Sequence, residues 1–303
     1  GVRRGGAYRG GKMKKGLIAI NKYFKNAALF NQCEALRRAF AARGVEINAV
    51  PTADLGLRIE GESVRADLPP CDFCIFLDKD VNAALMLEKC GVKLFNGAEA
   101  IRLCDDKMLT FIALSGAGIR MPETVPAPLM YAENDDAAFL DKTAARLGFP
   151  VVVKKAYGSM GAGVFLAENR EKMGEYFERF RLFPHLYQKF IGRGGEDLRI
   201  VTVGGKGAAA MRRVNRGDFR SNSERGGTGE RVLPTAAQIF IAERASGILK
   251  LDYAGVDILS DETGDYLCEV NSNAFFGGIA RAAEIDVADA YAEEIYGKIY
   301  RGM

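Results

Sequence analysis

The stretch "AGVDILSDETGDYLCEVNSN" (residues 254–273) consists of two largely apolar segments joined by a turn rich in Asp, Glu and Gly. This pattern is typical of a β-hairpin. Pairing the two strands about Thr263 places Asp257 opposite Glu269. Residues opposite each other on paired strands have Cβ atoms about 5 Å apart, so the sequence predicts that this hairpin brings two carboxylates together.

The same hairpin predicts a metal site. Side chains alternate along a strand, so Glu269, Asn271 and Asn273 leave by one face. Apolar neighbours flank Asp257 and Glu269, which indicates burial, and two buried carboxylates repel each other unless a cation lies between them. Magnesium takes oxygen donors only and accepts phosphate oxygens among them. A magnesium site built on Asp257, Glu269 and the neighbouring Asn oxygens is therefore favoured over a solvated polar face.

A glycine-rich loop joins two apolar strands in "VVVKKAYGSMGAGVFL" (residues 151–166). Without Cβ atoms, backbone N–H groups can approach an anion closely, although an ordinary mobile turn has the same composition. A lysine that ends the first strand inside the protein requires an anionic partner, which a phosphate supplies. Neighbouring strand residues face opposite ways, so only one of Lys154 and Lys155 points inward, and the sequence alone does not choose between them. The loop glycines are Gly158, Gly161 and Gly163.

A third candidate region is the arginine-rich stretch "AMRRVNRGDFRSNSERGGTGERV" (residues 210–232). Arginine forks match the geometry of carboxylates and phosphates, whereas a run of charge is often only solvated surface. The segment 220–222 stands between a core strand and a helix over 232–249 that opens with a capping box, Thr235 and Gln238. An anion-binding loop is the favoured interpretation.

The rest of the chain predicts three packed pieces that mix helices and strands. Short strands alternate with helices over residues 13–96, which indicates a parallel α/β unit without the GxGxxG fingerprint of dinucleotide binding. Residues 97–118 are predicted as one long helix, and prolines within 122–128 mark a linker. Antiparallel strands follow the glycine-rich loop, and a final helix is expected near 285–300. The cleft between the last two pieces is the expected site.

The composition is that of an ordinary soluble globular protein, with 48% hydrophobic and 27% charged residues among 303. No apolar run approaches the about 20 residues that span a bilayer, and no signal peptide opens the chain, so no membrane contact is expected. Four basic residues precede Met13, and without them the formal net charge falls from +3 to −1. We expect residues 1–12 to be a disordered leader added for expression rather than a basic arm, so nucleic acid is not an expected partner.

The six cysteines do not form a recognisable framework. Cys71 and Cys74 make a single CxxC pair, and the chain has one histidine, His185, so the four ligands of a structural zinc site are not evident. We expect reduced structural cysteines, a cytoplasmic protein and a structural role for His185.

The order of these motifs resembles that of ATP-grasp ligases, and in detail that of the RimK-like amino-acid ligases. The motifs follow one another as in that family, from about Asn96 to the end of the chain. They are Lys107, the loop after Lys154, "YQKFI", "FRSN", "GVDIL" and "CEVNSN". The resemblance implies an α/β and α+β architecture, namely an ATP-grasp fold preceded by a parallel α/β domain. The implied divisions are the leader (1–12), the N-terminal domain (13–96), a central subdomain with a glycine-rich lid (97–186) and a C-terminal subdomain with the metal site (187–303).

The resemblance also implies roles for individual residues. Lys107 and Lys154 would contact the phosphates of ATP, and Asp257, Glu269 and Asn271 would hold two Mg²⁺ ions, with Mn²⁺ as an alternative. The adenine-hinge positions are Lys189 and Phe190, and Gln188 beside them is a further implied nucleotide contact. The other implied nucleotide contacts are Gly158, Ser159, Gly161, Gly163, Asp197, Arg220, Ser221 and Asn222, of which Arg220 and Asn222 are the implied catalytic residues.

Two features depart from the family pattern. Lys189 stands where a glutamate is usual, so adenine recognition must rely more on backbone groups. The metal ligands continue into "NSNAFFGG" instead of small residues and proline, and Asn273, Phe275 and Phe276 would border the acceptor site. Substrate preference therefore does not transfer from the family's best-known member.

By resemblance, the chain is an ATP- and Mg²⁺-dependent ligase that forms an amide through an acyl phosphate. Its expected substrates are L-glutamate or a similar acidic amino acid, and a carboxylate acceptor that is either a protein or peptide C-terminus or a small molecule. A small-molecule kinase and a non-catalytic, synapsin-like ATP-binding scaffold are the alternatives, and a homo-oligomer is left open.

Overall fold

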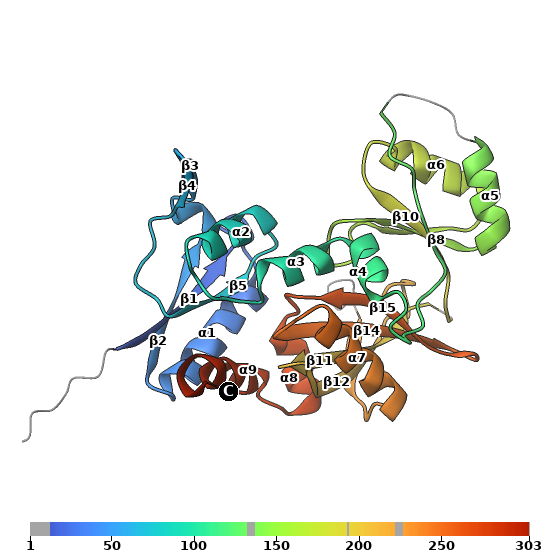
Figure 1. Ribbon diagram of the computed structural model, residues 1–303. Helices are drawn as coiled ribbons and strands as arrows, with labels where there is room; N and C mark the ends of the chain where they lie inside the picture. Colours follow the sequence, from blue (N-terminus) through green and yellow to red (C-terminus); the bar gives the residue numbers. More distant parts are fainter. Residues whose placement is uncertain (1–12, 132–136, 193, 222–226, 303) are drawn as a thin grey trace, which may run out of the picture.

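The computed structural model describes residues 13–131, 137–192, 194–221 and 227–302 (Figure 1). These residues form an N-terminal unit (14–95), a central lobe (124–189) and a C-terminal lobe (196–301). The expectations for residues 1–12 and for Asn222 fall outside the described residues. No helix within the described ranges combines the length and the apolar character that crossing a bilayer demands.

The N-terminal unit is the predicted parallel α/β unit, and its sheet carries a helix on each face. Its strands are β1 (Lys14–Ile20), β2 (Val45–Pro51), β5 (Phe73–Leu77) and β6 (Leu94–Phe95), in the order β2-β1-β5-β6. α1 (Ala27–Ala41) packs on the face that carries Ile18 and Ile75, whereas α2 (Val81–Lys89) packs on the face that carries Leu17 and Cys74. The helix that follows β1 and the helix that follows β5 therefore lie on opposite faces of the sheet. The 3-10 turn η1 (Thr52–Asp54) and a small hairpin, β3 (Arg58–Glu60) and β4 (Ser63–Arg65), complete the unit.

The prediction of one long helix over residues 97–118 is wrong. The structure has two helices here, α3 (Ala98–Asp105) and α4 (Lys107–Leu114). Asp106 is extended, with φ −95° and ψ 111°, and its side chain accepts hydrogen bonds from the backbone N–H groups of Met108 and Leu109. An aspartate that caps a helix in this way starts a new helix, because it satisfies donors that have no partner within the helix. Lys107 is consequently the first residue of α4.

The central lobe has its own sheet and its own apolar core. The sheet runs in the order β7-β10-β8-β9, and α5 and α6 cover it. β10 crosses the implied division at residues 186 and 187 and pairs with both β7 and β8. The elements are β7 (Thr124–Pro126), α5 (Ala137–Leu147), β8 (Val151–Lys155), β9 (Val164–Ala167), α6 (Arg170–Phe180) and β10 (His185–Lys189).

The C-terminal lobe is an antiparallel sheet in the order β13-β12-β11-β14-β15. Its strands are β11 (Glu196–Val203), β12 (Lys206–Val214), β13 (Thr228–Arg231), β14 (Tyr253–Asp261) and β15 (Gly264–Asn271). β14 and β15 form the predicted hairpin, and Asp257 pairs with Glu269, as predicted. The predicted capping box of Thr235 and Gln238 is present at the start of α7 (Ala236–Ile248). Two helices follow the hairpin, the unpredicted α8 (Phe276–Ala283) and α9 (Val287–Tyr296), and the chain continues in a π-helical turn, Gly297–Arg301.

The N-terminal unit is anchored to the C-terminal lobe. Residues of α1 and β5 share one apolar core with residues of β12, α8 and α9. The buried Asn96 side chain donates to the carbonyls of Tyr253 and Ser272, at 2.8 and 2.9 Å, and accepts from the N–H groups of Asp252 and Tyr253. Four hydrogen bonds from one side chain thus join the end of the N-terminal sheet to the C-terminal sheet.

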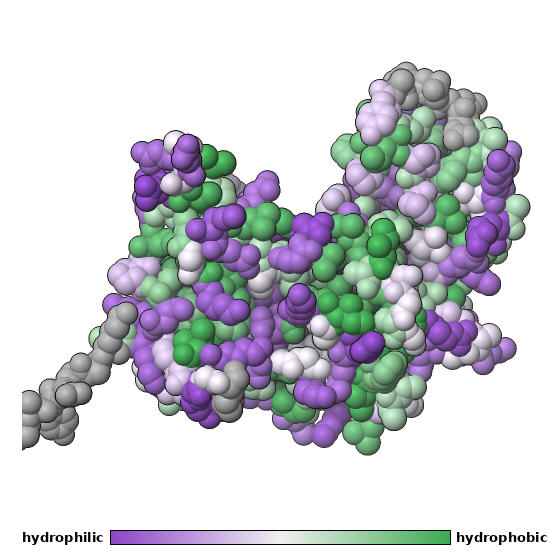
Figure 2. All heavy atoms as spheres, viewed as in Figure 1, coloured by the Kyte–Doolittle hydropathy of each residue, from purple (hydrophilic) through white to green (hydrophobic). Residues whose placement is uncertain are grey.

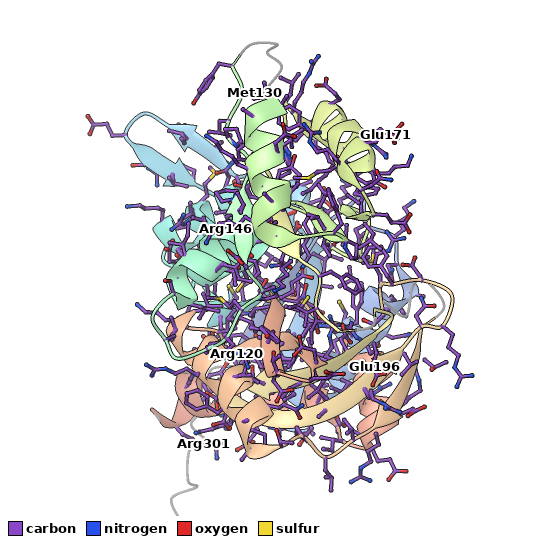
Figure 3. All side chains as sticks on the ribbon, turned by 90° about the vertical axis from the view of Figure 1, so that its right-hand side faces the viewer. Arg120, Met130, Arg146, Glu171, Glu196 and Arg301 are labelled. Atoms are coloured by element: carbon purple, nitrogen blue, oxygen red, sulfur yellow. The ribbon has the colours of Figure 1, made fainter. Side chains whose placement is uncertain are left out.

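The central lobe stands apart from this anchored pair. Figure 2 shows it rising above the other two parts, with a notch between it and the N-terminal unit. In the side view of Figure 3, Met130 and Arg146 lie on the central lobe, whereas Arg120 lies low, beside the C-terminal lobe. Arg120 donates to Tyr266 Oη at 2.8 Å, which ties the segment between the lobes to the β14–β15 hairpin.

Candidate active site

Two arginines from neighbouring strands surround Asp257. The Asp257 carboxylate is 3% exposed and accepts hydrogen bonds from Arg199 Nε and Nη2, each at 2.7 Å. Arg213 Nη2 lies 3.0 Å from Asp257 Oδ2 and also contacts Asp197. Burial opposes ionisation of Asp257, but the attraction of Arg199 and Arg213 outweighs it and lowers the pKa of this carboxyl. Burial raises the pKa of Asp197, against the attraction of Arg213.

Arg199 was not predicted as part of the site, and Arg213 was expected only as one arginine of the candidate anion-binding stretch, without a role at Asp257. Arg199 of β11 lies opposite Asp257 of β14, and Arg213 of β12 lies opposite Asp197 of β11. An arginine inside an apolar strand was the available signal, but its partner depends on pairing between strands that are far apart in the chain.

The face of the hairpin carries the predicted oxygen donors. Asn271 Nδ2 lies 3.4 Å from Asp257 Oδ2, and Glu269 Oε1 lies 3.5 Å from Lys107 Nζ. The described residues contain no group of three His, Cys, Asp or Glu side chains that could hold a metal ion. The amide of Asn271 would therefore have to act as a third ligand, together with phosphate oxygens. Two carboxylates, one amide and phosphate oxygens fit Mg²⁺, which binds through few protein ligands.

The structure distinguishes between the two neighbouring lysines. Lys154 points into the protein and is 5% exposed. Its Nζ lies 3.7 Å from Cys268 Sγ, and no carboxylate of the described residues forms an ion pair with it. Lys155 points the other way, with its Nζ 5.0 and 5.2 Å from the ring centroids of Phe180 and Phe183. Lys154 is thus a buried cation without an anionic partner among the described residues.

Two side chains from outside the glycine-rich loop, Lys107 and Arg220, donate hydrogen bonds to its backbone. Gly158 and Gly161 have φ angles of 120° and 67°, which favour glycine. Lys107, which is 6% exposed, donates from Nζ to the Gly158 carbonyl at 3.0 Å. Arg220 Nη1 donates to the carbonyls of Gly161 and Val164, each at 3.0 Å. The loop is consequently held from one side by α4 and from the other by the arginine-rich segment.

Two cavities meet at Glu269, which lines both. The smaller has a volume of about 90 Å³ and lies between the central and C-terminal lobes, where the site was expected. Of the predicted nucleotide contacts, its wall contains Lys154, Gly161, Gln188, Lys189, Phe190, Asp197, Arg220 and Ser221, as well as Asp257. Lys107, Gly158 and Gly163 are not part of this wall, and the structure of Asn222 is not described.

The larger cavity, of about 410 Å³, also involves the N-terminal unit. Ser159 of the glycine-rich loop, Arg199, Asn271, Asn273 and Phe275 line it. Phe276, which was expected to border an acceptor site, does not. Its ring packs in the core, 5.0 Å from the ring of Tyr253, because it is the first residue of α8 and turns towards the sheet. The lining residues of the N-terminal unit were not predicted, and they include Asn21, Phe24, Gln32, Asp78 and Lys79.

A comparison with protein families decides the relationship. Residues 104–295 match the RimK-like ATP-grasp domain. The chain belongs to the RimK-like ATP-grasp family. The resemblance carried by the motif order is thus confirmed.

Curated relatives of this RimK-like chain include synthases and ligases. Human N-acetylaspartylglutamate synthase A is 34% identical over 220 residues, which are 71% of this chain and 55% of that protein. Human beta-citrylglutamate synthase B is 32% identical over 257 residues, 80% of this chain and 64% of that protein. A probable alpha-L-glutamate ligase of Halorhodospira halophila is 38% identical over 212 residues, 69% of this chain and 68% of that protein. The RimK-like chain therefore spans less than two thirds of the two human relatives.

Solved structures show the same fold. An ATP-grasp RimK domain protein from Sphaerobacter thermophilus aligns with a TM-score of 0.71 at 23% identity, covering 93% of this chain and all of that one. D-alanine–D-alanine ligase from Bacillus anthracis, complexed with ATP, aligns with a TM-score of 0.68 at 17% identity, covering 95% of this chain and 96% of that one. The RimK-like chain has the predicted ATP-grasp fold, preceded by a parallel α/β unit.

Proposed function

We propose that this chain is an ATP- and Mg²⁺-dependent ligase that joins a carboxylate to an amine through an acyl phosphate. The observation that carries the proposal is Lys154, a buried ammonium without an anionic partner among the described residues, in a cavity that adjoins the paired carboxylates Asp257 and Glu269. A buried cation requires a counter-charge. A nucleotide phosphate would supply it, and a metal ion bound to the same phosphate would occupy the neighbouring carboxylates.

The smaller cavity would take the nucleotide. Lys107 and Lys154 would face its phosphates, while Gln188, Lys189 and Phe190 would line the adenine side. Small-molecule sites have volumes of about 300–1,000 Å³, so a cavity of about 90 Å³ must widen to admit ATP. Because Arg220 holds the glycine-rich loop in this structure, we infer that the loop is the lid that lifts. The remaining proposed contacts are Gly158, Ser159, Gly161, Gly163, Asp197, Ser221 and Asn222.

Asp257, Glu269 and Asn271 would hold the metal, as two Mg²⁺ ions or Mn²⁺. When bound, such ions supply positive charge that stabilises phosphoryl transfer. The protein contributes its own positive charge at this place, because Arg199 and Arg213 contact Asp257 and Lys107 contacts Glu269. Arg220 and Asn222, the proposed catalytic residues, belong to the arginine-rich segment beside the loop.

The proposed reaction has two balanced steps. A carboxylate oxygen of the acceptor attacks the γ-phosphorus of ATP, and the bond to ADP breaks. The ammonium of the second substrate gives up one proton, its nitrogen then attacks the acyl carbon, phosphate leaves, and the nitrogen loses a second proton as the amide forms. The names of the human relatives describe products that contain glutamate, so L-glutamate is the proposed amine. The acceptor is proposed to be a carboxylate, either of a small molecule or of a peptide C-terminus. A cytoplasmic location and the oligomeric state stay predictions.

Trapping with hydroxylamine tests the proposal. Purified protein, Mg²⁺-ATP and a pool of acids that begins with N-acetylaspartate and citrate should release ADP when L-glutamate is added, and mass spectrometry should identify an amide. Hydroxylamine in place of glutamate should yield a hydroxamate. A phosphorylated hydroxyl without any hydroxamate would establish the kinase alternative. Binding of Mg²⁺-ATP without ADP release from any pool would establish the scaffold.

A further inference from the structure

The larger cavity reaches the carboxyl ends of two strands of the N-terminal unit. Asn21 directly follows β1, and Asp78 directly follows β5. α1 and α2 lie on opposite faces of this sheet, so the crossover changes face between these two strands. In open parallel sheets, ligands bind in the crevice at such a switch point. The N-terminal unit therefore presents a natural ligand crevice to the larger cavity.

Asp78 places an unusual charge in this crevice. Its carboxylate is 7% exposed and accepts from Thr52 Oγ1 at 2.9 Å, from the backbone N–H of Lys79 at 2.7 Å, and from Asn21 Nδ2 at 3.3 Å. All three donors are neutral. A buried carboxylate with neutral partners only is costly unless a cation joins it.

The other charged side chains in the wall already have partners of opposite charge. Lys79 Nζ lies 2.8 Å from Asp105, Arg199 pairs with Asp257, and Glu269 pairs with Lys107. Among the described lining residues, Asp78 is thus the one ionic side chain without an ion-pair partner. The charge left unbalanced in the wall is negative, which favours a cationic ligand over a carboxylate.

Two residues that line the same cavity carry a buried carboxamide oxygen without a hydrogen-bond partner. Gln32 of α1 is 3% exposed, and its Oε1 has no hydrogen-bond partner. Asn273, which follows β15, likewise has no partner for Oδ1. These are the two buried side-chain polar atoms without a partner in the described part of the chain, and both residues line the larger cavity. Buried acceptors without a donor are rare in proteins, so two of them on residues of one cavity wall favour a ligand that donates hydrogen bonds.

We propose that the larger cavity binds a primary ammonium group through Asp78, Gln32 and Asn273. An ammonium carries one positive charge and three donors, which match one carboxylate and two carboxamide oxygens. This inference rests on the proposed ligase function, because it assigns the group to the amine substrate. The amine thereby enters from the N-terminal unit, and Glu269, shared by both cavities, separates it from the nucleotide.

Calorimetry with paired ligands tests the assignment. In the presence of Mg²⁺ and a non-hydrolysable ATP analogue, L-glutamate, L-aspartate and L-alanine are titrated against glutarate, succinate and propionate, which lack the ammonium group. At least one amino acid should bind about tenfold or more tightly than its counterpart. Asp78→Asn should remove that difference, and Gln32→Leu should reduce it about three- to tenfold. Asp54→Asn, which changes an exposed carboxylate paired with Lys22, should leave it unchanged.

Several outcomes would overturn the assignment. Equal binding of every amino acid and its counterpart by the wild-type chain would do so, and so would an unchanged preference in Asp78→Asn. Nucleotide affinity and thermal unfolding show whether each variant is folded. If Asp78→Asn does not fold, the result for Gln32→Leu decides whether the assignment holds.

Kinetics separate this inference from the proposed function. Hydroxylamine is uncharged near neutral pH and needs no ammonium site, so Asp78→Asn should still form hydroxamate while its KM for the amino acid rises about tenfold or more. A parallel loss of both products would assign Asp78 a merely structural role and overturn the inference. If the wild-type chain releases no ADP with any acid, the proposed function fails, while the binding comparison still decides the ammonium site.

Discussion

Arg220 Nη1 donates a hydrogen bond to the carbonyl oxygen of Gly161 at 3.0 Å. The arginine comes from the segment after β12, and the glycine belongs to the loop between β8 and β9. Asp218 holds the same guanidinium from its other side, with Oδ2 2.6 Å from Nη2. A side chain that was predicted from the sequence to contact the nucleotide therefore links the loop to the C-terminal lobe in this structure.

Replacing Arg220 with alanine should free the loop. We expect cleavage within residues 156–164 to become several-fold faster in limited proteolysis, because two hydrogen bonds from a charged donor to the loop are lost. ADP release should also fall. Arg216→Ala, an exposed neighbour, is the matched control. Identical cleavage rates in the two variants would show that Arg220 does not hold the loop.

Glu269→Ala should abolish turnover without unfolding the protein. Glu269 is a proposed metal ligand and lies between the two cavities, so its loss should lower the rate of ADP release by at least about a hundredfold. Thermal unfolding should change little, because this side chain is partly exposed and its ion-pair partner Lys107 keeps its hydrogen bond to the Gly158 carbonyl. Glu262→Ala, on the exposed turn of the same hairpin, should keep full activity. Substantial ADP release by Glu269→Ala would contradict the metal assignment.

Two adjacent arginines should differ widely in their effect on stability. Arg213 is 3% exposed and bridges Asp197 and Asp257. Arg213→Met leaves the buried Asp197 without its ion-pair partner and leaves Asp257 with Arg199 alone, so it should lower the free energy of unfolding by about 3–5 kcal/mol. Arg212 makes exposed ion pairs with Glu196 and Glu230, so Arg212→Met should cost at most about 1 kcal/mol. Urea unfolding of both variants measures the difference, and equal losses would refute it.

The pH dependence of stability should include a contribution from His185. Burial lowers the pKa of this imidazole, against weaker effects of the carbonyls of Phe183 and Phe180. The unfolded chain, with an ordinary pKa of about 6.5, then binds the proton more readily. The contribution is therefore complete above about pH 6.5 and is lost as the pH falls through the lower folded pKa.

His185 is the one histidine of the chain, so its ring resonances in NMR report this pKa directly. We expect a midpoint below that of a histidine peptide, and a flatter stability profile between about pH 7 and about pH 5 in His185→Gln. A midpoint at or above the peptide value would contradict the argument.

Features encoded within one short segment could be predicted from the sequence. The turn around Thr263 determines that Asp257 pairs with Glu269, and Thr235 and Gln238 are close enough in the chain to reveal their capping box. The break between α3 and α4 was missed because helical periodicity continues through it, while the side chain of Asp106 changes the backbone at a single residue.

Features that depend on distant strands could not be predicted. Arg199 meets Asp257 only because β11 pairs with β14, and the ion pair of Arg213 requires the additional pairing of β11 with β12. Gln32 and Asn273 reach one cavity from two different parts of the fold. Local periodicity contains no information on such encounters, which follow from the packing of complete sheets.

Ser159 and Met160 line the larger cavity, whereas Gly161, the next residue, lines the smaller one. One short loop thus forms part of the wall of both cavities. Lifting it to exchange ADP for fresh ATP would also uncover the compartment that contains the newly joined molecule. ADP and the amide product would then be released together, in one opening of the loop at the end of each catalytic cycle.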